Sequence, residues 1–302
     1  MAMVELKCSG LLKKYEGKRA LGPLNLDLKL SGITSIIGRN GAGKTTFIRI
    51  LATELMPTKG RVELDGIDVI NNPSELRNKI AIVPQESRPI PWMTPIQIVS
   101  SYLMLRGVSL KEAKMKAVDA LKTVGLDEKF FNKLSHKLSG GMKRELMLAT
   151  VIASDAKIIF LDEPTTGLDP ISRKEVWRVL NKLKKDRLII LTTHYLEEAE
   201  SLSDYIILIN KGKVISAGTF ADLSNSLKYP YSIRASAKKV GIRVRNGVVI
   251  KSEKGMQILT TEKSAKTIIE KLIKKRVEFS FGKVSLDDIF YTLVGKEYEN
   301  EE

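Results

Sequence analysis

The stretch GRNGAGKT, residues 38–45, places two glycines and a lysine at the spacing of a phosphate-binding loop. Glycines let backbone N–H groups converge on phosphate oxygens, and the helix expected to follow points its positive end at the same place. In this pattern Lys44 would reach the β- and γ-phosphates of a nucleotide, and Thr45 would ligate Mg²⁺. The predicted nucleotide contacts from this stretch are Gly38, Asn40, Gly41, Gly43, Lys44, Thr45 and Thr46.

Two neighbouring acids follow the apolar run in KIIFLDEP, residues 157–164. Asp162, at a strand end, would hold Mg²⁺ through water, and Glu163 would polarise the attacking water as general base. Together with the phosphate loop, these acids predict hydrolysis of a nucleotide. Motors, kinases, switches and transporters all use such loops, so the loop itself does not say what the hydrolysis drives.

These residues need elements that bring them together. Four apolar runs do not alternate with polar residues, which is typical of parallel strands buried on both faces. They are residues 33–37, 80–83, 158–161 and 188–191. Helical patterns separate them, as in residues 170–187, where Val176, Val179, Leu180 and Leu183 share one face. The alternation predicts an α/β sheet.

Each run is followed by polar residues: the phosphate loop, then Gln85, then the Asp162–Glu163 pair, and finally His194. Ligands of open parallel sheets bind at the carboxyl ends of the strands. We therefore expect these four strand ends to converge on one site.

The remaining chain predicts a helical insert and a small terminal domain. Residues 86–154 read as helices without a clear strand and open with the proline-rich SRPIPWMTP. After a linker-like SNSLKYP, β-like residues 248–250, a helix over residues 264–275 and the segment SLDDIFYTLVG indicate a separate domain of residues 225–302.

Composition narrows the class of protein. Fifty Lys+Arg against 35 Asp+Glu give a formal charge of +15, which suits a nucleotide, nucleic acid or an anionic membrane, or simply solvated helix surfaces. A single cysteine excludes an intramolecular disulfide, and no signal-peptide pattern opens the chain. No apolar run approaches the roughly 20 residues of a spanning helix. We expect a reducing cytoplasm and, at a membrane, an anchor supplied by a partner.

The segment LSGGM, residues 138–142, resembles the signature of the ATP-binding cassette (ABC) ATPases and stands shortly before KIIFLDEP, as in that family. Further motifs occur in the family's order: Tyr15, Gln85, GLDP at residues 167–170, and His194. The resemblance covers about residues 4–224. It implies an ABC-type P-loop NTPase of residues 1–224, with a mostly parallel sheet, an antiparallel β subdomain and the helical insert, followed by a small α+β domain. It also implies an ATPase that uses ATP and Mg²⁺.

The resemblance assigns roles to the remaining motif residues. Tyr15 would stack on adenine, although it could also be a packed aromatic. Gln85 would sense Mg²⁺ and water, and His194 would donate to the γ-phosphate. Asp169 would make a D-loop contact, while locally it reads as a helix N-cap with Pro170 at the first helical position. His136 is interpreted as a solvated loop residue without a role.

The signature itself has two interpretations. Locally, Ser139 is the N-cap of a helix. In the family this helix end faces the γ-phosphate held by a second cassette, which implies a head-to-tail dimer completed in trans by Ser139, Gly140 and Gly141. Met142 departs from the glutamine of many members, so we assign it no nucleotide contact.

Three functions fit such an ATP-dependent dimer. The first is the ATPase subunit of an ABC-2-type exporter of drugs, lipids, polysaccharides or sodium, because LSGGM, GLDPISR and SLDDIFYTLVG together look most like such ATPases. It would lie peripherally on the cytoplasmic face of the cell membrane. Its partners would be separate transmembrane permease subunits and a second ABC ATPase subunit, identical or a close paralogue. Trp92 and Met93 could seat a short helix of the permease or belong to a local core. The alternatives are an importer ATPase, or an ABC protein acting on nucleic acid, the ribosome or cofactor assembly. We expect no nucleic-acid partner.

Overall fold

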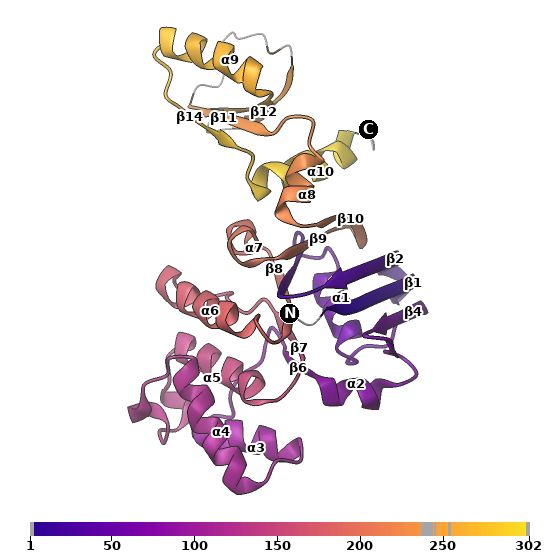
Figure 1. The fold of residues 1–302 in the computed structure, drawn as a ribbon, viewed down its shortest axis with the longest axis vertical. Coiled ribbons are helices and arrows are strands. Elements are labelled where there is room, and N and C mark those ends of the chain that lie inside the picture. Colours follow the sequence, from indigo (N-terminus) through magenta and orange to yellow (C-terminus); the bar gives the residue numbers. More distant parts are fainter. Residues whose placement is uncertain (1–2, 237–243, 245, 253–254, 300–302) are drawn as a thin grey trace. The chain divides into compact units, whose positions relative to one another are not determined.

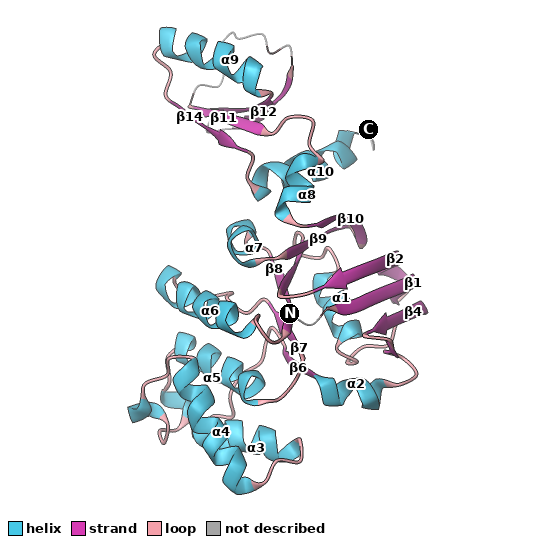
Figure 2. Ribbon diagram, viewed as in Figure 1, coloured by secondary structure: helices cyan, strands magenta, loops and turns pink. Residues whose placement is uncertain are grey.

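The computed structural model describes residues 3–236, 244, 246–252 and 255–299. The chain divides into two compact units, residues 1–215 and 216–302. Figure 1 shows the course of the chain, and Figure 2 distinguishes its helices and strands. Within the described part of the chain, every helix falls short of the length and apolarity that crossing a bilayer requires.

The first unit is built on a six-stranded sheet with the order β10-β9-β3-β8-β7-β6. The four predicted strands are confirmed, and a fifth, β9, joins their parallel arrangement. Every residue of β7 and β8 is buried, as expected for strands covered on both faces. The strands are β3 (Ile33–Ile37), β6 (Ile80–Val83), β7 (Ile158–Asp162), β8 (Leu188–Thr193), β9 (Tyr205–Asn210) and β10 (Lys213–Gly218).

A second sheet of the first unit is antiparallel, with the order β2-β1-β4-β5. Helix α1 (Lys44–Leu51), which follows the phosphate loop, contacts this sheet through β2 and the parallel sheet through β7 and β8. Its strands are β1 (Val4–Tyr15), β2 (Lys18–Leu30), β4 (Lys59–Leu64) and β5 (Ile67–Asp68); helix α2 (Pro73–Lys79) follows them. The antiparallel subdomain implied by the family resemblance is thus present.

The predicted helical insert contains α3 (Pro95–Leu105), α4 (Leu110–Thr123) and α5 (Gly140–Ala153). Two 3₁₀ turns, at Glu128–Phe130 and Ser135–Lys137, lie between α4 and α5, and residues 86–154 contain no strand. Helix α3 begins with a capping box in which Thr94 and Gln97 satisfy each other's backbone N–H groups. Figure 1 shows the three helices gathered together, apart from the antiparallel strands.

Helices α6 (Pro170–Leu183) and α7 (Leu196–Leu202) complete the first unit. The apolar face predicted for residues 170–187 is confirmed, since Val176, Val179 and Leu180 are buried. The helix ends at Leu183, however, and not at Arg187. The chain must turn there because β8 begins at Leu188, whose N–H bonds to the carbonyl of Lys157 beside β7.

The second unit carries a four-stranded antiparallel sheet with the order β12-β13-β11-β14. Ile233 and Ile258 of this sheet pack with Ala265, Ile268 and Leu272 of α9. The predicted helix over residues 264–275 is α9, which starts earlier because Thr261 caps it. The elements are α8 (Phe220–Asn225), β11 (Tyr231–Ala235), β12 (Gly247–Ser252), β13 (Gly255–Thr260), α9 (Glu262–Lys274), β14 (Phe279–Lys283) and α10 (Leu286–Glu299).

Candidate functional site

The phosphate loop connects β3 to α1 and has no room for side chains at two of its glycines. A Cβ on Gly38 would collide with the backbone carbonyl of Ile209, and a Cβ on Gly43 would lie 2.6 Å from the carbonyl oxygen of Ala20. Gly43 also has a φ of +103°, which L side chains rarely adopt. No side chain caps the N-terminus of α1. Its first N–H groups are therefore available to an anion.

Lys44 is buried at the start of α1, with only 5% of its surface exposed. Its Nζ donates to the carbonyls of Gly38, at 2.9 Å, and Arg39, at 3.3 Å, and lies 3.6 Å from Oε1 of Glu163. Burial lowers the pKa of the Lys44 ammonium, and the carboxylates of Glu163 and Asp162 act in the opposite direction. A phosphate next to Lys44 would add the negative charge that this desolvated cation favours.

Glu163 is the point at which the four strand ends meet. Its Oε2 accepts hydrogen bonds from Gln85 Nε2, at 3.3 Å, and from Thr166 Oγ1, at 3.0 Å. His194 Nδ1 lies 3.2 Å from the same oxygen but is not aligned for a hydrogen bond. With Lys44 on the other carboxylate oxygen, the predicted convergence is confirmed. The carboxylate thus has hydrogen-bond donors on one oxygen and the Lys44 ammonium near the other.

Asp162 and Thr45 form the candidate Mg²⁺ site. Thr45 Oγ1 donates to Asp162 Oδ1 at 3.2 Å, and the same oxygen accepts a short hydrogen bond from Thr192 Oγ1. No group of three His, Cys, Asp or Glu side chains among the described residues could cage a metal. One carboxylate and one hydroxyl fit Mg²⁺, which proteins hold through one or two ligands together with water and substrate phosphates.

A cavity of about 490 Å³ lies over these groups. Glycine amides, a lysine and three threonine hydroxyls are what a magnesium-bound triphosphate requires. The lining residues are Ala20, Asn40, Gly41, Gly43, Lys44, Thr45, Thr46, Gln85, Glu163, Thr166 and His194. Tyr15 is not among them: it stands at the end of β1, 44% exposed, with Lys13 Nζ 5.1 Å from its ring centroid. Its ring is not a packed core aromatic.

The signature and D-loop residues do not line this cavity. Ser139 is the N-cap of α5 and accepts from the N–H of Met142 at 3.2 Å, as predicted. Ser139 and Gly140 are exposed, while Met142 packs against the core of the helical insert. Asp169 caps α6 by accepting from Ile171 N and Ser172 N. Ser139, Gly140, Gly141 and Asp169 therefore lie outside the cavity that their own chain forms.

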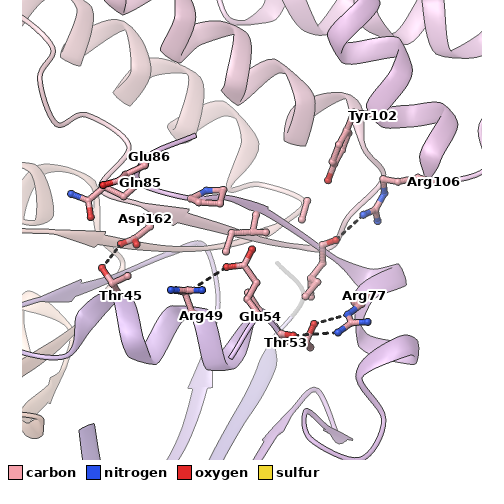
Figure 3. Close-up of a pocket in the computed structure, with 15 residues that line it drawn as sticks. Thr45, Arg49, Thr53, Glu54, Arg77, Gln85, Glu86, Tyr102, Arg106 and Asp162 are labelled. Atoms are coloured by element: carbon pink, nitrogen blue, oxygen red, sulfur yellow. Dashed lines mark hydrogen bonds and ion pairs between the residues drawn. The ribbon is translucent and has the colours of Figure 1, made fainter. Parts of the chain in front are cut away.

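A second hollow of about 990 Å³, called the groove below, adjoins the cavity through shared lining residues. Figure 3 shows the residues that line the groove. Arg106, the C-cap of α3, borders the groove and donates to the carbonyl of Ile80 at 3.0 Å. Arg77 borders it from α2 and donates to Thr53 Oγ1 at 2.9 Å. Thr45 and Gln85 line both this groove and the cavity. The groove is lined by Thr45, Arg49, Ala52, Thr53, Glu54, Arg77, Ile80, Ala81, Ile82, Pro84, Gln85, Glu86, Tyr102, Arg106 and Asp162.

Two further predicted positions lie on the helical insert. Trp92 is 74% exposed and so does not belong to a local core, whereas Met93 packs against the core of the insert. His136 is exposed in a 3₁₀ turn, with its Nδ1 3.1 Å from the carbonyl oxygen of Pro91. The structure gives it no place in the cavity.

Sequence reasoning missed several residues that shape the site. Thr192 bonds both Asp162 and the N–H of Glu163, and Thr166 bonds the Glu163 side chain. Ala20, from the distant strand β2, lines the cavity. Thr192 follows the apolar residues of LIILTT, and only the pairing of β8 with β7 places it opposite Asp162. The fourth missed residue is Arg144, on α5.

Comparisons with known proteins agree with this geometry. Residues 21–166 match the family model described as ABC transporter. The daunorubicin/doxorubicin resistance ATP-binding protein DrrA of Streptomyces peucetius is 34% identical over 96% of this chain and 92% of its own length. The retinal-specific phospholipid-transporting ATPase ABCA4 of Homo sapiens is 37% identical over 71% of this chain, which is 10% of its own length. The dimeric post-hydrolysis structure of the ATP-binding cassette MJ0796, bound to ADP and Pi, has a TM-score of 0.63 at 28% identity and covers 72% of this chain and 98% of that one.

Proposed function

This chain belongs to the ABC transporter family of ATPases, and on that premise we propose that it is the subunit whose ATP hydrolysis energises a membrane exporter. It is an ATPase with ATP as substrate and Mg²⁺ as cofactor. Export is supported by the similarity to a drug-resistance ATP-binding protein that spans nearly the whole chain. In this proposal the chain works at the cytoplasmic face of the cell membrane, bound to separate permease subunits.

The proposed chemistry uses the residues around Glu163. Lys44 and the first N–H groups of α1 bind and orient the phosphates. Thr45 and Asp162 would hold Mg²⁺, which would neutralise charge on the phosphates. Glu163 accepts a proton from the attacking water through a carboxylate oxygen. Gln85 and His194, both close to Glu163 Oε2, orient that water and the γ-phosphate.

The proposed working form is a dimer. Ser139 and Gly140 present a hydroxyl and a helix N-terminus to solvent, outside the cavity of their own chain. A two-fold arrangement would place this end of each copy against the nucleotide of the other, since isologous contacts repeat by symmetry. Tyr15 and Asp169 would then complete the site from the adenine side and the interface side. Hydrolysis removes the shared γ-phosphate and releases the two copies.

The observation that carries the transport proposal is the groove beside the cavity. Gln85 and Thr45 belong to the walls of both hollows, so an occupant of the groove adjoins the groups that handle the nucleotide. Tyr102 and Arg106 border the groove from the helical insert, and Trp92 stands exposed on the same insert. A short helix of a permease is the proposed occupant.

Dimer formation is tested by size-exclusion chromatography with light scattering. We expect Glu163→Gln with MgATP to elute as a dimer, and the same variant carrying Ser139→Arg to remain a monomer that still binds ATP. Ser109, the exposed N-cap of α4, supplies the control: Ser109→Arg loses a similar cap and gains the same charge. A Ser139→Arg protein that still dimerises with ATP would refute the trans arrangement.

A further inference from the structure

The backbone of Glu163 is in an unusual conformation. Its φ of +48° lies in the left-handed region, which residues other than glycine rarely occupy. Such a residue persists only when its surroundings hold it, because the conformation costs of the order of 1–3 kcal/mol. On the amino side, the N–H of Glu163 donates to Thr192 Oγ1 at 2.9 Å and lies 3.2 Å from the Thr192 carbonyl. These contacts hold the peptide group on the amino side of Glu163 and leave the one on its carboxyl side unexplained.

The carboxyl side of Glu163 is held by Arg144, a buried side chain of α5 with 9% of its surface exposed. Its guanidinium donates to three successive carbonyl oxygens, those of Asp162, Glu163 and Pro164. Nη2 bonds Asp162 at 3.3 Å and makes a short bond to Glu163, and Nε bonds Pro164 at 2.6 Å. The peptide planes on both sides of the strained residue thus meet one rigid, planar group.

Carbonyl oxygens satisfy Arg144 almost completely. A fourth hydrogen bond runs from Nη1 to the carbonyl of Gln85 at 3.3 Å, so four of its five N–H groups have acceptors. Burial lowers the pKa of the guanidinium, and the carboxylates of Asp162, Glu163 and Glu198 oppose that effect. A lysine could not replace it, because an ammonium has three donors and lacks the planar fork.

We propose that Arg144 is the positioning residue that holds the left-handed turn at Glu163 and thereby aims its carboxylate at the attacking water. The proposal rests on Glu163 being the general base. Arg144 does not line the cavity, so in this proposal it acts on the reaction only through Glu163. Because Arg144 lies on the helix capped by Ser139, the same side chain ties the signature helix to the base.

The first test compares Arg144→Lys and Arg144→Met with Arg187→Met. Arg187 is the matched control, since it too donates to carbonyl oxygens of α5, those of Val151 and Ile152, at the far end of the helix. We expect kcat for ATP hydrolysis to fall about 10²-fold in both Arg144 variants, because a catalytic group displaced by about 1 Å loses about that much rate. ATP affinity should be retained. Arg187→Met should lose thermal stability but keep kcat per folded molecule. Unchanged kcat in Arg144→Lys, measured on folded protein, would overturn the proposal.

The second test is a double-mutant cycle in single-turnover experiments. If Arg144 acts through Glu163, adding Arg144→Lys to Glu163→Gln should slow hydrolysis no further. A further loss equal to that of the single variant would show that Arg144 acts by another route and would refute the inference. Wild-type turnover in Glu163→Gln alone would instead refute the assignment of the base, and with it this proposal. If Arg144→Met does not fold, Arg144→Lys alone carries both tests.

Discussion

Replacing Glu163 with glutamine should separate catalysis from nucleotide binding. The substitution keeps the shape of the side chain and an oxygen that can accept from Thr166 or Gln85, but it removes the proposed proton acceptor. General base catalysis contributes about 10² to 10⁴ in rate, so the barrier should rise by about 2.7 to 5.4 kcal/mol. Phosphate release at saturating MgATP measures this loss, and a fluorescent ATP analogue measures affinity.

The same substitution should also reduce stability in the absence of nucleotide. Glu163 and Lys44 are both at least nine-tenths buried, and their charged atoms lie 3.6 Å apart. At an effective dielectric constant of about 20, that separation corresponds to about 4 to 5 kcal/mol of attraction, which solvent and relaxation reduce. Lys44 would keep only its bonds to two carbonyls. We expect a lower melting temperature for Glu163→Gln, largely restored by MgATP.

A pH dependence follows from the same pair. The Glu163 carboxylate raises the pKa of Lys44 against the lowering by burial, so its removal lowers that pKa further. Lysine attracts phosphate only when protonated, and the affinity of Glu163→Gln for ATP should therefore decline at a lower alkaline pH than that of the unaltered protein. Glu197→Gln, an exposed acid in the first turn of α7, is the control. In the phosphate-release assay described above, unchanged turnover of Glu163→Gln would refute the role of Glu163 as base.

Three further predictions concern other parts of the first unit. Lys44→Ala should weaken ATP binding about ten- to a hundredfold, because a hydrogen bond from a charged group contributes about that much affinity. Normal affinity in a fluorescence titration would contradict the assignment of residues 38–45 as a phosphate-binding loop. Burial raises the pKa of the Cys8 thiol to about 12, against about 8.5 in an unfolded chain. Between these values the thiol ionises only in the unfolded state, so the free energy of unfolding should fall as pH rises from about 8.5. Denaturation at increasing pH measures that slope, and the Cys8→Ala variant should lose the part of it that Cys8 contributes. Trp92→Ala should keep its melting temperature, because Trp92 is 74% exposed, but should shift the protein from the membrane fraction of cells to the supernatant; retention in the membrane would exclude Trp92 from the docking surface.

The sequence predicts the elements that carry the site because the physical cause of each is local. Continuous apolar runs mark β3, β6, β7 and β8, and their carboxyl ends must meet at one edge of the sheet. An element with a weaker signal is not predicted: in β14 (Phe279–Lys283) the alternation is limited to Phe279, Ser280 and Phe281, and the strand is mostly exposed. Its place depends on pairing with β11.

The roles of Thr192 and Arg144 could not be predicted for a related reason. Threonine at a strand end and arginine on a helix are ordinary in sequence, and only the tertiary fold places one on each side of Glu163. The left-handed φ of Glu163 is equally invisible, since nothing in LDEP requires it. Local patterns thus indicate which residues react, whereas long-range contacts decide how they are held.

The groove and the cavity share Gln85 and Thr45 as lining residues, and this has a thermodynamic consequence. If ATP changes the affinity of the groove for its occupant by some factor, that occupant must change the affinity for ATP by the same factor. Any coupling between the two hollows therefore acts in both directions. A peptide that fills the groove should act as an effector of nucleotide binding, without touching the nucleotide.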